Sequence, residues 1–442
     1  MKKTNDISNK NLNMINNRRR KLMFLIAFVF FATNTFAQSW NEVIKATASR
    51  PDGGNEFGRS VSIYGDWAII GSPHDYLDEN ESHSKQNAGS AYIFKKDNQG
   101  NWIQTQKICS DSRYSLLYFG YSVSMSEKYL IVGAYGKNLN SPSGMQKKFS
   151  GAAYIFEKNA EGVWKETQRL IPSQIGYNYK FGYSVSISGE YAIIGGDKLS
   201  YGKAFIFERT AQGTWTEVQK LASENHEKYD KFGQSVCISG NYALVGAQKF
   251  EDAGTSYVGA VHIYERNSKG TWKEIQRITA SDKTEKNHFG ASMSISGDYI
   301  VVGAHSAKAK EVNKGAAYIF KKSSKGKWKE SQKLISSNGK SDDFFGGSVS
   351  ISGKYLVVGA EGCDGGNELK NSGAAYIFEL NSEGNWKQIK KNTASDAASG
   401  DNFGVSVSMS GKNLIVGANL KGRKKMNGDI ALDTGASYIF KK

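Results

Sequence analysis

The stretch FGGSVSISGKYLVVGA, residues 345–360, decides the fold of this 442-residue chain, because close copies of it occur seven times. The copies begin at successive spacings of 62, 62, 51, 57, 56 and 58 residues, at Phe57, Phe119, Phe181, Phe232, Phe289, Phe345 and Phe403. A variable stretch and a GAAYIF-like phrase follow each copy, and in all but the last a polar turn and a WKExQKL-like segment come next. A period of this size indicates a repeat architecture, and the repeats fill residues 39–442 as one array.

Each phrase of the repeat predicts one short strand. SVSIS alternates Ser with Val or Ile, as a half-buried strand does, and the Ser-Gly pair after it predicts a tight hairpin turn. The YLIVGA-like and AAYIF-like runs predict strands buried on both faces, whereas WKEIQRI alternates apolar with charged residues and predicts an exposed outer strand. The predicted fold class is therefore all-β, a seven-bladed β-propeller with four antiparallel strands in each blade.

The two ends of the array predict how the ring closes. The last unit, from Phe403, lacks a Trp strand, while SWNEVIKATAS near the N-terminus is a Trp strand with no unit before it. Residues 403–442 and 38–56 together make 40 + 19 = 59 residues, which falls within the 51–62 range of the other units. We therefore expect residues 38–56 to complete the last blade, which removes two unpaired sheet edges.

The FGxSV…IVGA signature resembles the FG-GAP repeat, known from the seven-bladed propeller of integrin α chains and from bacterial surface and secreted proteins. The GAAYIF phrase and the W…Q strand are similar to the bacterial subgroup. This resemblance covers almost the whole chain after residue 38. It implies a propeller, and it leaves the function open.

The sequence departs from the integrin type at the calcium loops. Several integrin repeats have a D-x-D-x-D-G loop between the first two strands, whereas here the connection is SISGEY, SISGNY, SISGDY or SISGKY. Calcium takes six to eight oxygen ligands, which one Asp298 or Glu190 cannot supply. Neither a metal site nor a cofactor is predicted.

The first 37 residues predict a secretory signal peptide. Arg18, Arg19, Arg20 and Lys21 precede an apolar run from Leu22 to Ala32, and Thr35 and Ala37 form a small-residue cleavage site. A permanent anchor is the alternative, although eleven apolar residues are short for a bilayer. The mature chain, residues 38–442, is then one domain that is secreted, periplasmic or at the cell surface, with no stable membrane insertion.

The mature chain is basic. Residues 1–37 hold seven Lys or Arg and one acid, so the net charge falls from +16 to +16 − 6 = +10. An exported protein rarely meets nucleic acid, so we expect an extracellular or envelope glycan or protein as partner, bound by a monomer. For the charge itself, we favour a solvated Lys-rich surface that maintains solubility over recognition of acidic glycans, lipopolysaccharide or an anionic envelope surface. The three cysteines have no disulfide or zinc spacing and are expected to be free thiols.

Strand order predicts which face carries function. The loops after the second strand and the loops that enter each Phe-Gly share one face, and binding residues usually lie on such loops. Aromatic and imidazole side chains there suit a binding surface. The candidate ligand-binding residues are His74, Tyr76, Tyr135, Tyr201, Tyr257 and His305. The alternative is that each Tyr only caps its own blade.

Three functions remain open: a non-catalytic binding module, a structural envelope or matrix scaffold, and a carbohydrate-active enzyme. Glycoside hydrolysis needs two carboxylates across a pocket. The loop-face candidates show no repeated or paired pattern in the sequence; they are Asp75, Asp78, Asp230, Asp252, Asp342, Asp343, Asp364 and Asp401. Since no G-x-S-x-G, H-E-x-x-H or P-loop occurs, we predict a binding module with no catalytic residues.

Overall fold

The computed structural model describes residues 39–442 apart from 51–53, 83, 197–201, 223–229, 253, 310–311, 367–368, 425–429 and 432–433. The predicted signal peptide therefore lies outside the described residues. The chain divides into two units, Met1–Asn41 with Lys442 and Glu42–Lys441, and the propeller belongs to the second. Every regular element among the described residues is a β-strand. This part of the chain contains no helix long and apolar enough to cross a bilayer.

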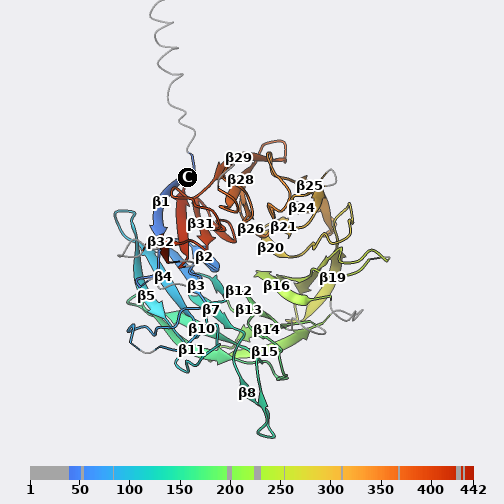
Figure 1. The fold of residues 1–442 in the computed structure, drawn as a ribbon. Helices are drawn as coiled ribbons and strands as arrows, with labels where there is room; N and C mark the ends of the chain where they lie inside the picture. Colours follow the sequence, from blue (N-terminus) through green and yellow to red (C-terminus); the bar gives the residue numbers. More distant parts are fainter. Residues whose placement is uncertain are drawn as a thin grey trace, which may run out of the picture. The chain divides into compact units, whose positions relative to one another are not determined.

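The strands form seven four-stranded antiparallel sheets around a common centre (Figure 1). Blade 1 contains β2 (Ser60–Tyr64), β3 (Trp67–Ser72), β4 (Ser90–Lys96) and β5 (Trp102–Ile108). Blade 2 contains β6 (Ser122–Met125), β7 (Tyr129–Ala134), β10 (Ala152–Lys158) and β11 (Trp164–Leu170). Blade 3 contains β12 (Ser184–Ser188), β13 (Tyr191–Gly196), β14 (Lys203–Arg209) and β15 (Trp215–Leu221). Blade 4 contains β16 (Phe232–Ser239), β17 (Tyr242–Ala247), β18 (Ala260–Arg266) and β19 (Trp272–Ile278).

The remaining blades repeat this plan. Blade 5 contains β20 (Ser292–Ser296), β21 (Tyr299–Ala304), β24 (Ala316–Lys322) and β25 (Trp328–Leu334). Blade 6 contains β26 (Ser348–Ser352), β27 (Tyr355–Ala360), β28 (Ala374–Leu380) and β29 (Trp386–Asn392). Blade 7 contains β30 (Ser406–Ser410), β31 (Asn413–Ala418), β34 (Ala436–Lys441) and β1 (Asn41–Ala46).

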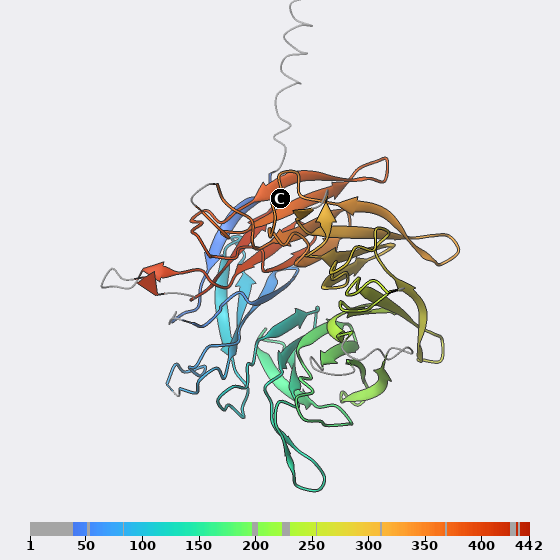
Figure 2. The same cartoon turned by 45° about the vertical axis from the view of Figure 1, so that its right-hand side comes forward.

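Three small hairpins extend the connections between the second and third strands. They are β8 (Leu139–Asn140) with β9 (Gln146–Lys147), β22 (Lys308–Ala309) with β23 (Val312–Asn313), and β32 (Arg423–Lys424) with β33 (Ile430–Ala431). The green β8–β9 hairpin projects from the ring in both views (Figures 1 and 2). These connections range from 6 residues in blade 3 to 17 in blades 1, 2 and 7.

Serines of the SVSIS strand join each blade to the next. The first Ser of each strand donates its hydroxyl hydrogen to the carbonyl of the Phe-Gly glycine in the following blade, as Ser60 does to Gly120 at 2.9 Å. The same bond closes every junction: Ser60–Gly120, Ser122–Gly182, Ser184–Gly233, Ser235–Gly290, Ser292–Gly346, Ser348–Gly404 and Ser406–Gly58. The alternation seen in the sequence therefore places Ser against the neighbouring backbone and Val or Ile in the core.

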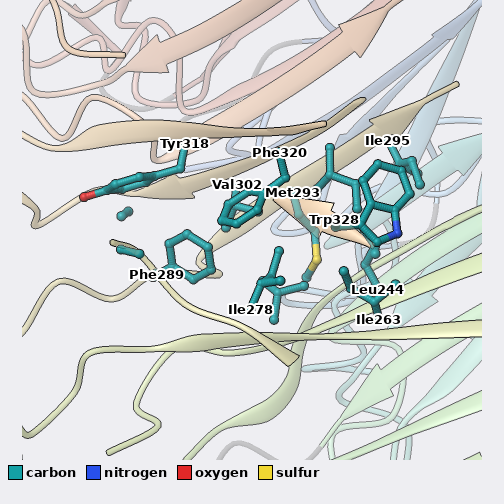
Figure 3. Close-up of a cluster of buried hydrophobic side chains, with 14 of the residues drawn as sticks. Leu244, Ile263, Ile278, Phe289, Met293, Ile295, Val302, Tyr318, Phe320 and Trp328 are labelled. Carbon is teal, nitrogen blue, oxygen red and sulfur yellow. The ribbon is translucent and has the colours of Figure 1, made fainter. Parts of the chain in front are cut away.

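The core lies between neighbouring blades. Figure 3 shows the cluster between blades 4 and 5, where Phe289 packs edge-on against Tyr318 with ring centroids 5.5 Å apart. Met293 and Val302 of blade 5 meet Leu244 of blade 4 in the same cluster. Since each Phe of a Phe-Gly is at most 1% exposed, the phenyl ring anchors the loop that carries it.

A second junction lies at the outer strands. Gln106 accepts a hydrogen bond from the Trp164 N–H at 2.8 Å and donates one to its carbonyl at 3.1 Å. Five junctions carry this pair of bonds: Gln106–Trp164, Gln168–Trp215, Gln219–Trp272, Gln276–Trp328 and Gln332–Trp386. At the two junctions of the closing blade, Lys390 and Ile44 occupy the place of the Gln. This explains why the repeat keeps a Gln four residues after its Trp.

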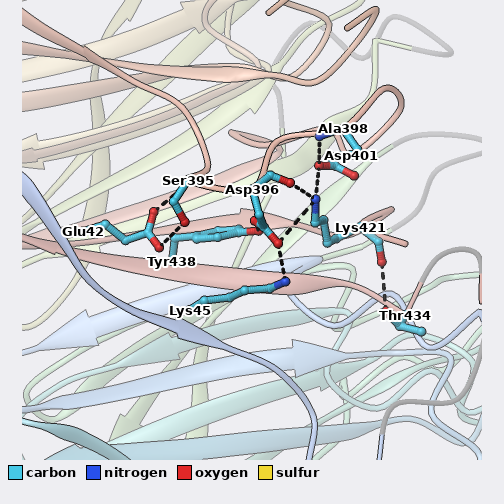
Figure 4. A network of polar contacts seen from close by, with 9 residues as sticks. All are labelled: Glu42, Lys45, Ser395, Asp396, Ala398, Asp401, Lys421, Thr434 and Tyr438. Atoms are coloured by element: carbon cyan, nitrogen blue, oxygen red, sulfur yellow. Dashed lines mark hydrogen bonds and ion pairs between the residues drawn. The ribbon is translucent and has the colours of Figure 1, made fainter. Parts of the chain in front are cut away.

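The N-terminal strand completes blade 7, which confirms the predicted closure. In that sheet β1 lies beside β34, in the order β1-β34-β31-β30. Glu42 accepts hydrogen bonds from the backbone N–H of Ser395 at 3.2 Å and from its hydroxyl at 2.8 Å (Figure 4). Lys45 pairs with Asp396 at 2.6 Å. Strands more than 340 residues apart in the sequence thus form one blade.

Candidate functional site

The loops that enter each Phe-Gly have one fixed length, whereas the loops between the second and third strands vary. Ten residues separate the last strand from the Phe in all seven blades, for example 47–56 and 393–402. The residue before each Phe has a positive φ between 51° and 61° and a half-buried side chain, although none is glycine. These residues are Glu56, Tyr118, Lys180, Lys231, His288, Phe344 and Asn402. Glycine would adopt this left-handed backbone conformation without strain. A residue with a side chain costs about 1 kcal/mol or more of conformational energy here, and every blade nevertheless has one.

The residues after each Phe-Gly surround one mouth of the central channel. They are large and polar in blades 1–4 and small in blades 5–7: Arg59, Tyr121, Tyr183, Gln234, Ala291, Gly347 and Val405. A cavity of about 250 Å³ opens here, lined by all of these positions but Ala291 and by the first serines and valines of the inner strands. The mouth is thus asymmetric, with polar and aromatic groups on one side and small residues on the other.

Five rings of blades 1–3 gather beside this mouth, and we call them the tyrosine cluster: His74, Tyr118, Tyr121, Tyr135 and Tyr183. Tyr118 and Tyr135 stack with centroids 4.8 Å apart and planes 9° apart, and Tyr121 meets Tyr135 edge-on at 4.7 Å. His74 lies 5.5 Å from Tyr118. The cluster joins loops of different blades into one aromatic surface.

A second group, the histidine cluster, comes from blades 4–6 and consists of Tyr257, His288, His305 and Phe344. The two imidazoles stack at 5.2 Å, and Tyr257 and Phe344 lie beyond them at 6.3 and 6.1 Å. Burial, the neighbouring His305 and two nearby lysines lower the pKa of His288 to about 4, and burial also lowers the pKa of His305. At neutral pH both rings are therefore uncharged and present aromatic faces.

The structure brings four of the six predicted residues to these two clusters. His74 and Tyr135 belong to the tyrosine cluster, and Tyr257 and His305 belong to the histidine cluster. Tyr76 is half-buried and lies in neither cluster, and Tyr201 lies outside the described residues. Arg59, Tyr118 and His288 were not among the predicted candidate residues. Their fixed place directly before or after a Phe-Gly was a signal in the sequence that could have identified them.

The acidic loop residues bind groups within their own blades. Asp75 accepts a hydrogen bond from the Tyr92 hydroxyl at 2.6 Å and pairs with Lys107 at 3.0 Å, with both charged side chains almost fully buried. A more exposed version occurs at blade 7, where Asp396 accepts a hydrogen bond from the Tyr438 hydroxyl at 2.6 Å and pairs with Lys45 (Figure 4), with the two charged side chains 44% and 35% exposed. Asp–Tyr–Lys groups of this kind hold loops in place.

The expectation that the loop acids follow no repeated pattern is wrong for three of them. Asp230, Asp343 and Asp401 all stand two residues before a Phe, are buried, and accept a backbone N–H at 2.7–2.9 Å. Asp401 also pairs with buried Lys421 at 2.7 Å. Three other acids have local partners as well, namely Asp78, Asp342 and Asp364, and Asp252 pairs with Lys283 in the loop that enters blade 5.

The opposite mouth of the channel holds a larger cavity, which the sequence did not predict. It measures about 530 Å³ and is lined by the turns between the first two strands of blades 2–4, by apolar side chains of the inner strands, and by Tyr64. Glu190 in this wall accepts a hydrogen bond from Tyr129 at 3.4 Å and lies 3.7 Å from Arg209. Backbone turns make up much of this mouth, whereas the Phe-Gly mouth is walled by aromatic rings.

The Ser-Gly turns keep the short form expected from the sequence, and the described residues hold no group of three or more His, Cys, Asp or Glu that could bind a metal. Cys109, Cys237 and Cys363 form no disulfide. We therefore expect the melting temperature of the mature protein to be the same in chelator and in millimolar calcium, because a native-state ligand would raise it by mass action. A drop of several degrees in chelator that calcium reverses would contradict this.

Proteins similar to this chain are found among solved structures. A comparison with curated protein sequences gives no significant match. Among solved structures, a protein from Lactobacillus plantarum is similar at 13% identity and a TM-score of 0.49, covering 79% of this chain and 86% of that one. The periplasmic gluconolactonase PpgL of Pseudomonas aeruginosa is similar at 13% identity and a TM-score of 0.48, covering 80% and 88%.

The profile of the FG-GAP repeat matches seven segments: 40–94, 102–156, 164–207, 215–264, 272–320, 328–378 and 386–440. Each segment starts at a Trp and ends in the third strand of the following blade, so sequence repeat and blade are offset by one strand. Because of this offset, the outer strand of blade 7 comes from the N-terminal part of the sequence, and the other three strands of that blade come from the C-terminal part. With seven matched repeats in one closed ring, the chain belongs to the FG-GAP repeat family.

Proposed function

We propose that this protein is an exported, non-catalytic binding module that recognises an envelope or extracellular glycan through its Phe-Gly face. The observation that carries the proposal is the pair of aromatic clusters on either side of one channel mouth. Flat rings such as the stacked Tyr118–Tyr135 pair suit the apolar faces of sugars, and they contribute contact area with few rotatable bonds. Export by the N-terminal 37 residues belongs to the same proposal.

The placement of the loop acids supports binding over hydrolysis. A glycosidase needs two carboxylates that face one substrate bond. Seven of the eight loop acids have partners inside their own loops or blades, Asp252 pairs with Lys283 of the loop that enters blade 5, and three of the eight are buried acceptors of a backbone N–H. Glu56 at the mouth is held by His74 at 3.4 Å and by the Asn419 amide at 3.3 Å. These carboxylates hold loop conformation.

Removal of three rings from the two clusters should weaken binding and preserve the fold. A glycan array with the mature protein first identifies a ligand, and calorimetry then measures its affinity. We expect the triple variant Tyr135→Ala, Tyr257→Ala and His305→Ala to bind at least about tenfold more weakly, because hot-spot aromatics contribute about 2 kcal/mol or more each.

Two matched controls separate the faces. Tyr64→Ala removes an aromatic ring that is 45% exposed at the opposite mouth, and it should leave affinity unchanged. Lys269→Gln with Lys325→Gln removes exposed charge from turns on that face and should alter only the salt dependence. If the control variants lose binding and the triple variant keeps it, the functional face is the other one.

A further inference from the structure

Resting on the proposed function, we infer that the ligand is an acidic polysaccharide and that Arg59 binds the carboxylate of one of its sugar residues in the cavity at the Phe-Gly mouth. Neither the repeat signature nor the fold assigns a role to this arginine. Four features support the inference: the hydrogen bonding of Arg59, the surrounding charges, the size of the cavity and the flanking aromatic rings.

Arg59 is held in place and keeps donors available. Its Nη2 donates to the Tyr121 hydroxyl at 3.1 Å, and its guanidinium lies 5.2 Å from the centre of the Tyr121 ring. Tyr121 in turn donates to the Tyr183 hydroxyl at 3.0 Å. No carboxylate of the described residues lies within ion-pair distance of Arg59. A guanidinium has five N–H donors in a planar fork that matches a carboxylate, and the Tyr121 contact uses one of them.

The charges around the mouth favour an anion. Lys180 lies over the Tyr135 ring at 5.7 Å, and Lys249 lies over the Tyr257 ring at 4.9 Å, so each cluster carries an ammonium group. Two carboxylates, Glu56 and Glu361, lie near Arg59. Glu56 accepts a hydrogen bond from the Asn419 amide and lies 3.4 Å from His74, and burial raises the pKa of Glu361 even though the positive charge of Arg59 opposes this. Three cations, Arg59, Lys180 and Lys249, therefore lie beside two carboxylates at this mouth.

The cavity size fits one sugar residue. A volume of about 250 Å³ is below the range of roughly 300–1,000 Å³ that holds drug-sized ligands, so the mouth accepts one small group. Gly347 and Val405, in blades 6 and 7, leave room across the mouth from Tyr183 and beside Arg59. Tyr121 and Tyr183 of the tyrosine cluster line the cavity, and the other rings of the two clusters lie outside it, where rings of adjoining sugars can stack. A long carbohydrate chain uses all three surfaces, whereas an isolated carboxylate uses only the first.

The test compares ligands that differ only in charge. Galacturonan, alginate and hyaluronan oligosaccharides are each measured by calorimetry beside their methyl-esterified forms, which keep the sugar rings and lose the anion. The proteins are the mature chain, Arg59→Gln, Arg59→Lys and, as a matched control for lost surface charge, Lys325→Gln. Polyglutamate serves as the acidic peptide competitor, and each series is repeated in 0.5 M salt, which screens exposed charges more than buried ones.

We expect the mature chain to prefer at least one acidic oligosaccharide over its ester by about tenfold or more, as charge-assisted bonds of this type imply. Arg59→Gln should abolish the preference and keep the residual affinity for the ester, Arg59→Lys should keep part of the preference, and Lys325→Gln should keep it all. Equal binding of acid and ester, with no effect of Arg59→Gln, overturns this inference and leaves glycan binding intact. Failure of every oligosaccharide overturns both proposals, and tighter binding of polyglutamate shows that the partner is an acidic protein.

Discussion

Deletion of residues 39–46 is expected to lower the melting temperature of the mature protein by about 10 °C or more and to make it aggregate. The deletion removes the whole of β1, so β34 becomes an unpaired edge of blade 7. It also removes Trp40, which is 1% exposed, and loss of a buried Trp side chain costs about 3 kcal/mol or more. The contacts of Glu42 with Ser395 disappear as well.

Thermal melting and size-exclusion chromatography measure this effect. The control is Val43→Ala on the same strand, because this side chain is 47% exposed and its truncation should change stability by no more than about 0.5 kcal/mol. A deletion variant that melts at the same temperature as the intact mature protein and stays monomeric would contradict closure of the ring by β1.

Substitution of Gly303 by Ala is expected to destabilise the ring by about 4 kcal/mol or more. The backbone φ of Gly303 is not left-handed, so the cost comes from space alone. An added Cβ would lie 2.0 Å from the carbonyl oxygen of Gly346 in the next blade and 2.3 Å from the Ser292 hydroxyl. That hydroxyl donates to the same carbonyl at 2.9 Å, so the methyl group would break the serine bond between blades 5 and 6.

Gly347→Ala is the matched control for the loss of a glycine. Its Cβ would meet only the Phe344 carbonyl at 3.2 Å, and blade 5 already has Ala291 at the corresponding place. Urea unfolding of both variants gives the comparison. Equal urea midpoints for Gly303→Ala and Gly347→Ala would show that the blades can separate to admit a methyl group. That result would contradict the close packing inferred here.

The sequence alone determined the number of blades, the four strands of each and the partner of the N-terminal strand. These features depend on local patterns that repeat seven times: period-two alternation in SVSIS, glycines at the turns, and a Trp strand missing from the end of the last unit. Local propensity and burial pattern agree in every copy, so the repeated signal outweighs the ambiguity of any single strand. The roles of the conserved Ser and Gln were not predicted, because their partners lie in the next blade.

The candidate site was predicted only in part. Loop topology correctly placed His74, Tyr135, Tyr257 and His305 on the Phe-Gly face, since strand order fixes which loops share a face. It did not show that Asp75 is buried against Lys107 and Tyr92, which turns an apparent catalytic candidate into a loop anchor. An aspartate looks the same in the sequence whether it is a catalytic carboxylate or a loop anchor. Only its neighbours in the structure distinguish these two roles.

Only the tertiary structure decided which side chains meet at the channel mouth. Tyr118, Tyr135 and Tyr183 come from three separate loops, and nothing in their spacing predicts a stack at 4.8 Å or a chain of hydrogen bonds that ends at Arg59. The repeat fixes the backbone of every loop to one conformation, but the side chains next to each Phe-Gly differ from blade to blade. Their contacts depend on how neighbouring blades pack, because the serine bond at each junction brings the loops of blades 1, 2 and 3 side by side.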